Sequence, residues 1–434
     1  MAVSQGPKGT RDLYPEEMAF QQFMFDSWHR TCRRYGFEQY EGPMFEHLEL
    51  YTQKSGDEIE KQLYAFEDKG GRMIALRPEL TPTLARMVAA KGTNLKRPVR
   101  WYSIPRLFRY ERMQKGRLRE FIQLNMDILG VEDVIADAEL IAASVAMMKD
   151  LGLTEEDFKV RISSRTLLEE LFLKFGVQKE ALASLYALLD KKTKIPPESY
   201  TQEMENLIPR DEIRSKVDEV FSAGTLGDIE RIGGSDLPAF QELKELFTLL
   251  ETYGLASYAV FDIGIVRGLA YYTGIVFELF DVRKNLRAIA GGGRYDKLVS
   301  LYGGPATPAV GFAAGDVVLG ELLKEKGLLP PSASRSDLFL ITIENSVYPQ
   351  TIKTAQQLRN NGIACEFTLK RGVNIGKQLK NANAARSRFA LFIGGEEASR
   401  GMMKLKNLDS GLEELVPGHN VVETVLKKIK GESD

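Results

Sequence analysis

The sequence of 434 residues is poor in the two residue types that most often carry catalysis and metal binding. It contains three histidines (His29, His47 and His419) and two cysteines (Cys32 and Cys365). Two thiols far apart in the chain supply neither a disulfide framework nor a four-cysteine zinc site. Catalysis by a histidine base is possible, but the chain offers few candidates for it.

Neither sign of charge is in large excess. Lys and Arg number 58, Asp and Glu number 60, and the net charge at pH 7 is −2. This balance excludes a chain that is basic throughout, although a local basic face remains compatible with it. The 44% hydrophobic and 27% charged residues are ordinary values for a soluble globular protein. At about 150 residues per domain, the length predicts two or three domains.

Long apolar runs are also missing. The longest, near Ile141 to Met148, falls far short of the roughly 18 residues that cross a bilayer. The first residues, Met-Ala-Val-Ser-Gln-Gly-Pro-Lys-Gly, lack the apolar region of a secretory signal. We therefore expect a cytoplasmic protein without a membrane partner.

Hydrophobic periodicity divides the first three quarters of the chain into helices and strands. It predicts a helix over Pro15–Tyr35, two strands over 101–112 and 119–130, a helix over Asp137–Leu151 and strands within 257–281. In the second strand the alternation of Phe121, Gln123, Asn125 and Asp127 places a row of polar side chains on one face. Residues of about 165–250, rich in Leu, Glu and Lys at helical spacing, are interpreted as a helical insertion. Glycines 291–293 favour a hairpin turn, and a helix is expected from Asp316.

The last quarter of the chain is predicted to be a separate domain. The segment Lys324–Asp337 contains two prolines, serines and mixed charges, which is typical of a linker, and the linker itself is placed at residues 326–336. From residue 337 a β-α-β-α-β pattern follows, which predicts a small α/β domain with a largely parallel sheet. Between Lys353 and Lys406 there are eleven Lys or Arg and three Asp or Glu, a local excess of eight positive charges. Such a stretch suits contact with phosphate groups of RNA, and a solvated helix face is the alternative.

Common nucleotide-binding fingerprints are missing: there is neither a P-loop nor a Gly-x-Gly-x-x-Gly after a strand. A bound nucleotide would need a different cradle. Five cations lie within eleven residues on a predicted strand–loop–strand: Arg109, Arg112, Lys115, Arg117 and Arg119. Guanidinium forks match phosphate oxygens, and Phe121 is placed to stack on a purine. A solvated charged hairpin explains the same composition.

Two further segments carry polar groups in suggestive places. In Arg77-Pro78-Glu79-Leu80-Thr81 a carboxylate and a hydroxyl lie on one side of an extended chain, where they can hold an ammonium group. A helix beginning near Thr81 explains this segment equally well. Arg267 lies in an otherwise apolar segment, so it needs either a carboxylate partner or an anionic ligand.

Taken together, these segments resemble the histidyl-tRNA synthetase family of class II aminoacyl-tRNA synthetases from end to end. The landmarks are residues 7–12, Tyr35-Gly36-Phe37 with Pro43, the 77–81 segment, motif 2 from Phe108 to Gln123, and the two segments 267–272 and 292–296. The resemblance implies an α+β fold. A class II catalytic domain (1–325) would stand on a mixed, mostly antiparallel sheet with a helical insertion, and an α/β anticodon-binding domain (337–434) would follow the linker.

The resemblance also implies an activity. ATP would activate L-histidine as histidyl-adenylate, and the histidyl group would then pass to the cognate tRNA. Glu79, Thr81 and Gln123 would bind the ammonium group of histidine, while Asp127, Tyr271 and Tyr272 would surround its imidazole. Arg267 would bridge the histidine carboxylate and the α-phosphate.

For ATP, the resemblance assigns Arg109 to the α-phosphate, Glu111 to the adenine amino group and Phe121 to stacking on the ring. Mg²⁺ would accompany the nucleotide, and the enzyme would be a homodimer. The chain departs from the family pattern at three positions: Val318 stands where motif 3 has an arginine for the γ-phosphate, Ala270 where an aspartate is common, and Asp127 where a glutamate is usual. Arg117 or Arg119 is expected to compensate for the missing arginine.

The alternative interpretation is a non-catalytic paralogue, a synthetase-like regulatory subunit of ATP phosphoribosyltransferase. Val318 and Ala270 favour it slightly. Against it, the chain retains Glu79, Arg109 and a basic C-terminal domain, for which a protein that only senses histidine has little use.

Overall fold

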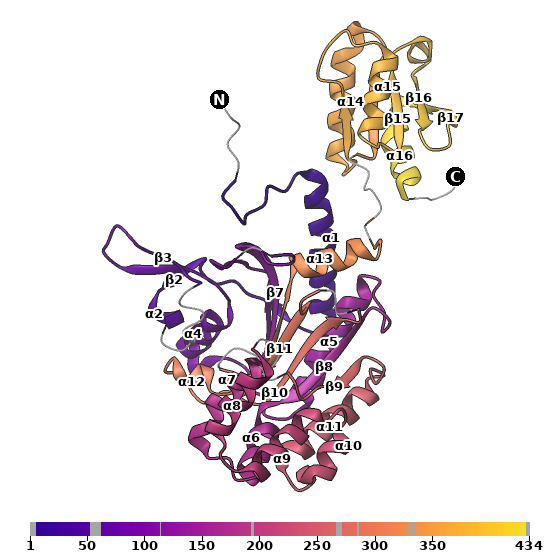
Figure 1. The fold of residues 1–434 in the computed structure, drawn as a ribbon. Coiled ribbons are helices and arrows are strands. Elements are labelled where there is room, and N and C mark those ends of the chain that lie inside the picture. Colours follow the sequence, from indigo (N-terminus) through magenta and orange to yellow (C-terminus); the bar gives the residue numbers. More distant parts are fainter. Residues whose placement is uncertain are drawn as a thin grey trace. The chain divides into compact units, whose positions relative to one another are not determined.

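The computed structural model describes residues 6–52, 62–112, 114–191, 195–265, 271–283, 286–328, 330 and 336–430. These residues form two compact units, 1–329 and 330–434. Each unit has its own sheet and its own hydrophobic core (Figure 1). Within the described residues, no helix combines the length and apolarity needed to cross a bilayer.

A nine-stranded sheet organises the first unit. Its order is β1-β5-β7-β12-β11-β10-β8-β9, and β6 also pairs with β7. The pairs β1–β5 and β8–β9 are parallel and the others are antiparallel, which confirms the predicted mixed, mostly antiparallel sheet. The strands are β1 (Glu38–Gln39), β5 (Val99–Ser103), β6 (Arg106–Phe108), β7 (Glu120–Leu129), β8 (Phe158–Ser164), β9 (Ala259–Phe261), β10 (Ile275–Asp281), β11 (Ala290–Arg294) and β12 (Ala309–Gly315).

Two strand predictions need correction. The segment 101–112 is not one strand: it divides into β5 and β6 around Pro105, which cannot donate to a sheet ladder. Glycines 291–293 form no turn but lie in β11, between β10 and β12. A Cβ on Gly292 would overlap the Gly311 carbonyl oxygen and come within 2.7 Å of Phe277 Cζ. Glycine is therefore required here by close packing inside the sheet and not by chain reversal.

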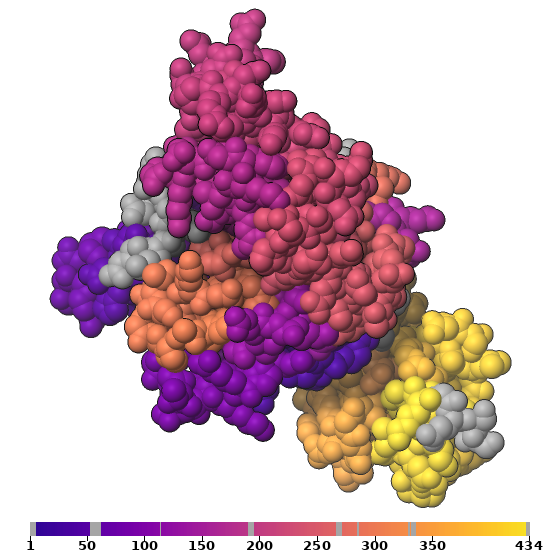
Figure 2. Space-filling view, turned by 90° about the horizontal axis from the view of Figure 1, so that it is seen from below, coloured from indigo at the N-terminus to yellow at the C-terminus, as the bar shows by residue number. Residues whose placement is uncertain are grey.

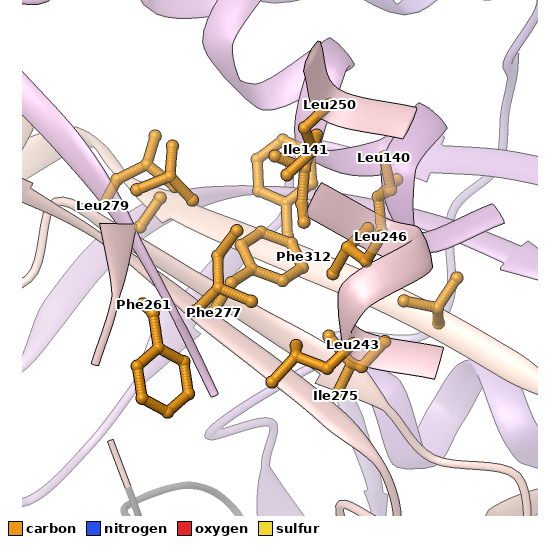
Figure 3. Close-up of a cluster of buried hydrophobic side chains, with 14 of the residues drawn as sticks. Leu140, Ile141, Leu243, Leu246, Leu250, Phe261, Ile275, Phe277, Leu279 and Phe312 are labelled. Carbon is orange, nitrogen blue, oxygen red and sulfur yellow. The ribbon is translucent and has the colours of Figure 1, made fainter. Parts of the chain in front are cut away.

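One face of this sheet carries the main hydrophobic core. The helices α1 (Pro15–Arg34), α5 (Ile135–Asp150) and α13 (Asp316–Glu325) lie over it. The predicted helix over 15–35 is confirmed, with Trp28 and Cys32 fully buried on its inner side. Phe277 and Phe312 meet in the core next to leucines of α5 and of α11 (Pro238–Thr252) (Figure 3).

Residues 165–252 contribute helices and, in their described part, no strand. They comprise α6 (Arg165–Lys174), α7 (Leu182–Lys191), α8 (Pro197–Leu207), α9 (Asp211–Ser222), α10 (Leu226–Ile229) and α11, with short η2 (Lys179–Ala181) and η3 (Glu230–Gly234) turns between them. Their surface is continuous at one end of the first unit (Figure 2, magenta to pink).

A smaller sheet, β2-β4-β3, is followed in the chain by α4. This helix packs on the face of the main sheet that lies opposite the main hydrophobic core. The elements are β2 (Phe45–His47), α2 (Glu49–Thr52), β3 (Tyr64–Glu67), β4 (Met73–Leu76), α4 (Thr81–Lys91) and η1 (Gly92–Asn94). Helix α4 packs against α12 (Leu298–Leu301) and against Tyr271 and Tyr295. The side chains between α4 and the sheet form the candidate site.

The second unit contains more than the predicted β-α-β-α-β pattern. Its sheet runs β14-β13-β15-β16-β17, with β14, β13 and β15 parallel and the last two antiparallel. The hairpin of β16 and β17 and the final helix α16 were not predicted. The elements are β13 (Leu338–Thr342), η4 (Asn345–Val347), α14 (Tyr348–Asn360), β14 (Cys365–Phe367), α15 (Ile375–Ala384), β15 (Phe389–Ile393), η5 (Glu396–Arg400), β16 (Met402–Asn407), β17 (Glu413–Pro417), η6 (Gly418–Asn420) and α16 (Val421–Lys430).

Candidate active site

The site begins with the alternation of β7. Gln123, Asn125 and Asp127 lie on one face of this strand, as the sequence predicts. On β12 their direct neighbours are Gly315, Ala313 and Gly311, and β11 continues the rows with Gly291 and Gly293. Cross-strand partners share a face of the sheet, so the three polar side chains of β7 lie next to a surface of glycine and alanine residues on β12 and β11. This surface is called the floor of the site. These small residues on β11 and β12 leave room for a ligand.

This floor, together with α4 and residues 271–272, encloses a first cavity of about 150 Å³. Its polar lining consists of Glu79, Thr81, Arg109, Gln123, Asn125, Asp127, Tyr271, Tyr272 and Tyr295. Six of these are the residues that the sequence analysis assigned to histidine binding: Glu79, Thr81, Gln123, Asp127, Tyr271 and Tyr272. They come from three separate segments of the chain and meet around one space.

Glu79 is a buried carboxylate with one oxygen uncommitted. Its Oε2 accepts a hydrogen bond of 2.7 Å from the Tyr271 hydroxyl, while Oε1 finds no donor among the described residues. Burial raises the pKa of Glu79, and the Tyr271 hydrogen bond and the Arg109 charge lower it in part. An unpaired, buried carboxylate oxygen at a cavity is costly unless a donor arrives with a ligand. Glu79 is thus suited to an ammonium group.

Asp127 is a second buried carboxyl group that lines the first cavity. Its Oδ1 accepts a hydrogen bond of 2.5 Å from Tyr295, and burial raises the pKa of Asp127 to about 7. A Cβ on the neighbouring Gly311 would overlap that oxygen, so only glycine leaves the carboxylate in place. A carboxyl group with a pKa near neutrality accepts or donates a proton according to what binds it.

A second cavity of about 180 Å³ adjoins the first. It is lined by the motif 2 side chains Arg109, Glu111, Arg117 and Phe121, by Arg287, and by Val317 and Val318 at the start of α13. Arg109 and Gln123 line both cavities. The start of α13 is fixed here because Asp316 accepts hydrogen bonds from Arg11, from Gln21 and from the Ile122 backbone N–H.

Arg109 is held at the junction of the two cavities. Its Nε donates to the Pro78 carbonyl oxygen at 2.8 Å, and its guanidinium lies 5.3 Å from the centre of the Phe121 ring. Glu111 is buried and forms an ion pair with Arg117. The side chains beside the Phe121 ring therefore bear both signs of charge, which suits a base with polar edges and a charged phosphate tail.

Arg119 is not brought to either cavity. Its guanidinium lies over the Tyr110 ring at 4.0 Å, its Nε donates to the Glu111 carbonyl oxygen, and its stem packs on Gly9. Arg267 and Ala270 lie outside the described residues. Arg294, which belongs to the segment 292–296, is also turned away, since it pairs with the buried Asp137.

Three residues of the site were missed from the sequence. Asn125 belongs to the polar row of β7 and Tyr295 to the segment 292–296, but neither position by itself indicates a contact with a ligand. Arg287 follows the end of β10 and showed no local signal. Arg287 precedes the glycine-rich strand β11. Its place at the second cavity follows only from the position of β11 in the sheet, one strand away from β7.

Comparisons with known proteins agree with this geometry. The family model of histidyl-tRNA synthetase matches residues 9–316, and that of an anticodon binding domain matches residues 337–428. A mixed, mostly antiparallel sheet that carries two adjoining cavities, followed by such a domain, fits a class II aminoacyl-tRNA synthetase, and the family match identifies the chain as one.

Individual relatives point the same way. The chain is 41% identical to a histidine–tRNA ligase of Opitutus terrae over 97% of this chain and 98% of that protein. It is also 41% identical to the chloroplastic/mitochondrial histidine–tRNA ligase of Arabidopsis thaliana, over 93% and 83%. The crystal structure of histidyl-tRNA synthetase from Nostoc sp. PCC 7120 superposes with a TM-score of 0.80 at 26% identity, covering 99% of this chain and 100% of that one. The chain belongs to the histidyl-tRNA synthetase family.

Proposed function

We propose that this protein ligates L-histidine to its cognate tRNA in two steps, and that the two adjoining cavities hold histidine and ATP. The observation that carries the proposal is the position of Arg109, which lines both cavities. In the first step a carboxylate oxygen of histidine attacks the α-phosphorus of ATP and pyrophosphate leaves. In the second, the terminal ribose hydroxyl of the tRNA attacks the acyl carbon and AMP leaves.

Histidine is proposed to lie in the first cavity with its ammonium group at Glu79, Thr81 and Gln123. The uncommitted Oε1 of Glu79 supports this orientation. The imidazole is then proposed to contact Asp127, one of whose carboxylate oxygens is fixed by Tyr295. A site with two such buried polar groups rejects an amino acid that leaves them unpaired by a factor of roughly 10⁴.

ATP is proposed to lie in the second cavity, with adenine on Phe121, its amino group at Glu111 and its α-phosphate at Arg109. Arg117 neutralises Glu111 and adds positive charge to the same wall. Arg267 remains a proposal for the bridge between carboxylate and phosphate. No protein nucleophile is needed, because positioning and charge neutralisation carry this chemistry.

Magnesium is expected to accompany the nucleotide. Protein ligands for the ion would be carboxylate or other oxygen groups close to the second cavity. Among the described residues, no three His, Cys, Asp or Glu side chains converge as a metal cluster. Glu111, the acidic residue in the described lining of the second cavity, is already paired with Arg117. The described residues therefore do not form a metal cage, and no step is assigned to the ion.

The second unit is proposed to bind tRNA. Its local excess of eight positive charges between Lys353 and Lys406 supports contact with phosphates, and its sequence matches an anticodon binding domain. Specific reading of bases in a single-stranded loop fits this kind of domain.

A homodimer is proposed through the small sheet of the first unit. Phe45 on β2 and Phe66 on β3 are each about half exposed, at 53% and 47%, and their register partners Leu76 and Ile74 on β4 place them on one face of this sheet. Large apolar side chains gathered on one sheet are typical of a surface that a second subunit covers. A cytoplasmic location remains a prediction of the sequence.

The regulatory-subunit alternative is less supported. The chain matches the synthetase model over residues 9–316, and it retains the anticodon-binding unit and the charged second cavity. These features favour an enzyme that uses ATP and tRNA over a protein that only senses histidine.

The test is histidine-dependent exchange of labelled pyrophosphate into ATP, followed by charging of tRNA. The purified protein should perform both reactions. Arg109→Ala should reduce the exchange rate by roughly 10²–10³, as expected for loss of one electrostatic contact to the reacting phosphate. A folded protein that binds histidine but shows no exchange would refute the enzyme assignment and favour the regulator.

A further inference from the structure

The second cavity contains a cation, Arg287, to which the family resemblance gives no role. Arg287 follows β10 and lines this cavity together with the motif 2 residues Arg109, Glu111 and Arg117. Among the described residues, Glu111 forms its ion pair with Arg117, and none forms one with Arg287. Two guanidinium groups, those of Arg109 and Arg287, thus face the cavity without a carboxylate partner of their own in this part of the chain.

This arrangement is unfavourable for the empty protein. Partial burial lowers the pKa of Arg287, and so does repulsion from Arg117 and Arg109, while Glu111 offsets part of it. Arg287 is exposed in the empty cavity, so solvent screens part of this repulsion, and a polyanion that binds between the guanidinium groups relieves the rest. The cluster is therefore better explained by an anionic ligand than by a structural role.

Another wall of the cavity lacks the cation that the family resemblance predicts. Residue 318, at the start of α13, is a valine whose side chain is 9% exposed. Its Cγ2 packs close to Gly116. The wall formed by Val317 and Val318 is thus apolar, and the triphosphate must find its positive charge elsewhere. Arg119, a candidate from the sequence, is engaged with Tyr110.

We propose that Arg287 binds the β- and γ-phosphates of ATP and takes the place of the arginine missing at position 318. Its guanidinium offers a planar fork that matches two phosphate oxygens, and it stabilises the negative charge that develops on the departing pyrophosphate. Arg109 at the α-phosphate and Arg287 farther along then hold the triphosphate at two points. This inference rests on the proposed binding of ATP in the second cavity.

The experiment compares Arg287→Ala, Arg287→Lys and the control Arg283→Ala in pyrophosphate exchange. Arg283 lies on the same connection between β10 and β11, is exposed, and is not part of the lining. We expect Arg287→Ala to lower kcat/KM for ATP by roughly 10²–10³ and to leave KM for histidine unchanged. Arg287→Lys should recover part of the loss, since the charge returns without the fork. Arg283→Ala should behave as the unmodified protein.

A second probe separates phosphate binding from stacking on adenine. A non-hydrolysable histidyl-adenylate analogue carries the base, ribose and amino acid but no β- or γ-phosphate. Arg287→Ala should bind this analogue as tightly as the unmodified protein does, measured by calorimetry, which also verifies that the variant is folded.

Two results would overturn the inference. One is an Arg287→Ala variant with unchanged kcat/KM for ATP beside an active unmodified protein. The other is an equal loss of affinity for ATP and for the analogue, which would assign Arg287 to the base. Absence of exchange in the unmodified protein would instead refute the proposed function itself.

Discussion

Replacement of Asp127 by asparagine tests the electrostatics of the first cavity most directly. Burial raises the pKa of this carboxyl group from its ordinary value of 3.8 to about 7. In the pH range between these two values, the native protein holds a proton that the unfolded chain has released. Stability must therefore fall as pH rises through this range. A tenfold change in an acid dissociation constant corresponds to about 1.4 kcal/mol, so ionising Asp127 in the folded protein costs about 4 kcal/mol.

Asparagine has the same shape and cannot ionise, so the variant should lose this pH dependence. The stability change due to Asp127 is confined to the pH range between its two pKa values, 3.8 in the unfolded chain and about 7 in the folded protein. In an experiment that runs from pH 5 to pH 8, this change therefore falls between pH 5 and about pH 7. Over that interval the stability of Asp127→Asn should rise relative to the unmodified protein by about 2–3 kcal/mol. Other buried carboxyl groups remain in both proteins, so the difference isolates Asp127.

Urea unfolding at a series of pH values, followed by tryptophan fluorescence, measures this difference. Both tryptophans, Trp28 and Trp101, lie in the first unit, so the signal reports the unit that contains the site. Glu219→Gln, which changes an exposed carboxylate on α9 of the same unit, is the control and should run parallel to the unmodified protein. Parallel stability curves for Asp127→Asn would refute the reasoning, because burial would then not penalise the charged form.

Two further substitutions test single contacts of the first cavity. Tyr271→Phe removes the 2.7 Å hydrogen bond to Glu79 and should raise KM for histidine by roughly 10–100-fold in pyrophosphate exchange, since hydrogen bonds to charged groups contribute about 1.5–3 kcal/mol. An unchanged KM would show that this hydrogen bond does not orient Glu79 toward the substrate. Gly311→Ala places a Cβ against Asp127 Oδ1, so the variant should lose about 1–3 kcal/mol of unfolding free energy, measured in urea. It should also show no measurable histidine binding by calorimetry. A variant of native stability that binds histidine normally would contradict the packing argument.

The polar row of β7 shows what local pattern predicts well. Alternation places Gln123, Asn125 and Asp127 on one face because strand geometry has a period of two, whatever the rest of the fold does. The helix α1 was predicted for the same reason, since its spacing of apolar residues follows the helical period. The linker over residues 326–336 falls largely outside the described residues and stays a prediction from composition.

The glycines of β11 show where local pattern fails. A run of three glycines favours a turn when only neighbouring residues are considered. In the folded sheet, Gly292 faces Phe277 and Phe312 in the core, while Gly291 and Gly293 lie on the face of the cavity. Whether glycine serves a turn or a close approach depends on the strands that pair on either side, and those are distant in sequence.

The amino-acid sequence by itself determined the periodic elements, the division into two parts and the residue types needed for an ammonium group and a polyphosphate. Only the tertiary structure decided which of those residues meet. Asp127 and Tyr295 are 168 positions apart and become partners through the pairing of β7, β12 and β11. The same pairing brings Arg287 to the second cavity, while Arg119 is diverted to Tyr110. Side-chain chemistry is local, but proximity is a property of sheet register, which many distant residues set together.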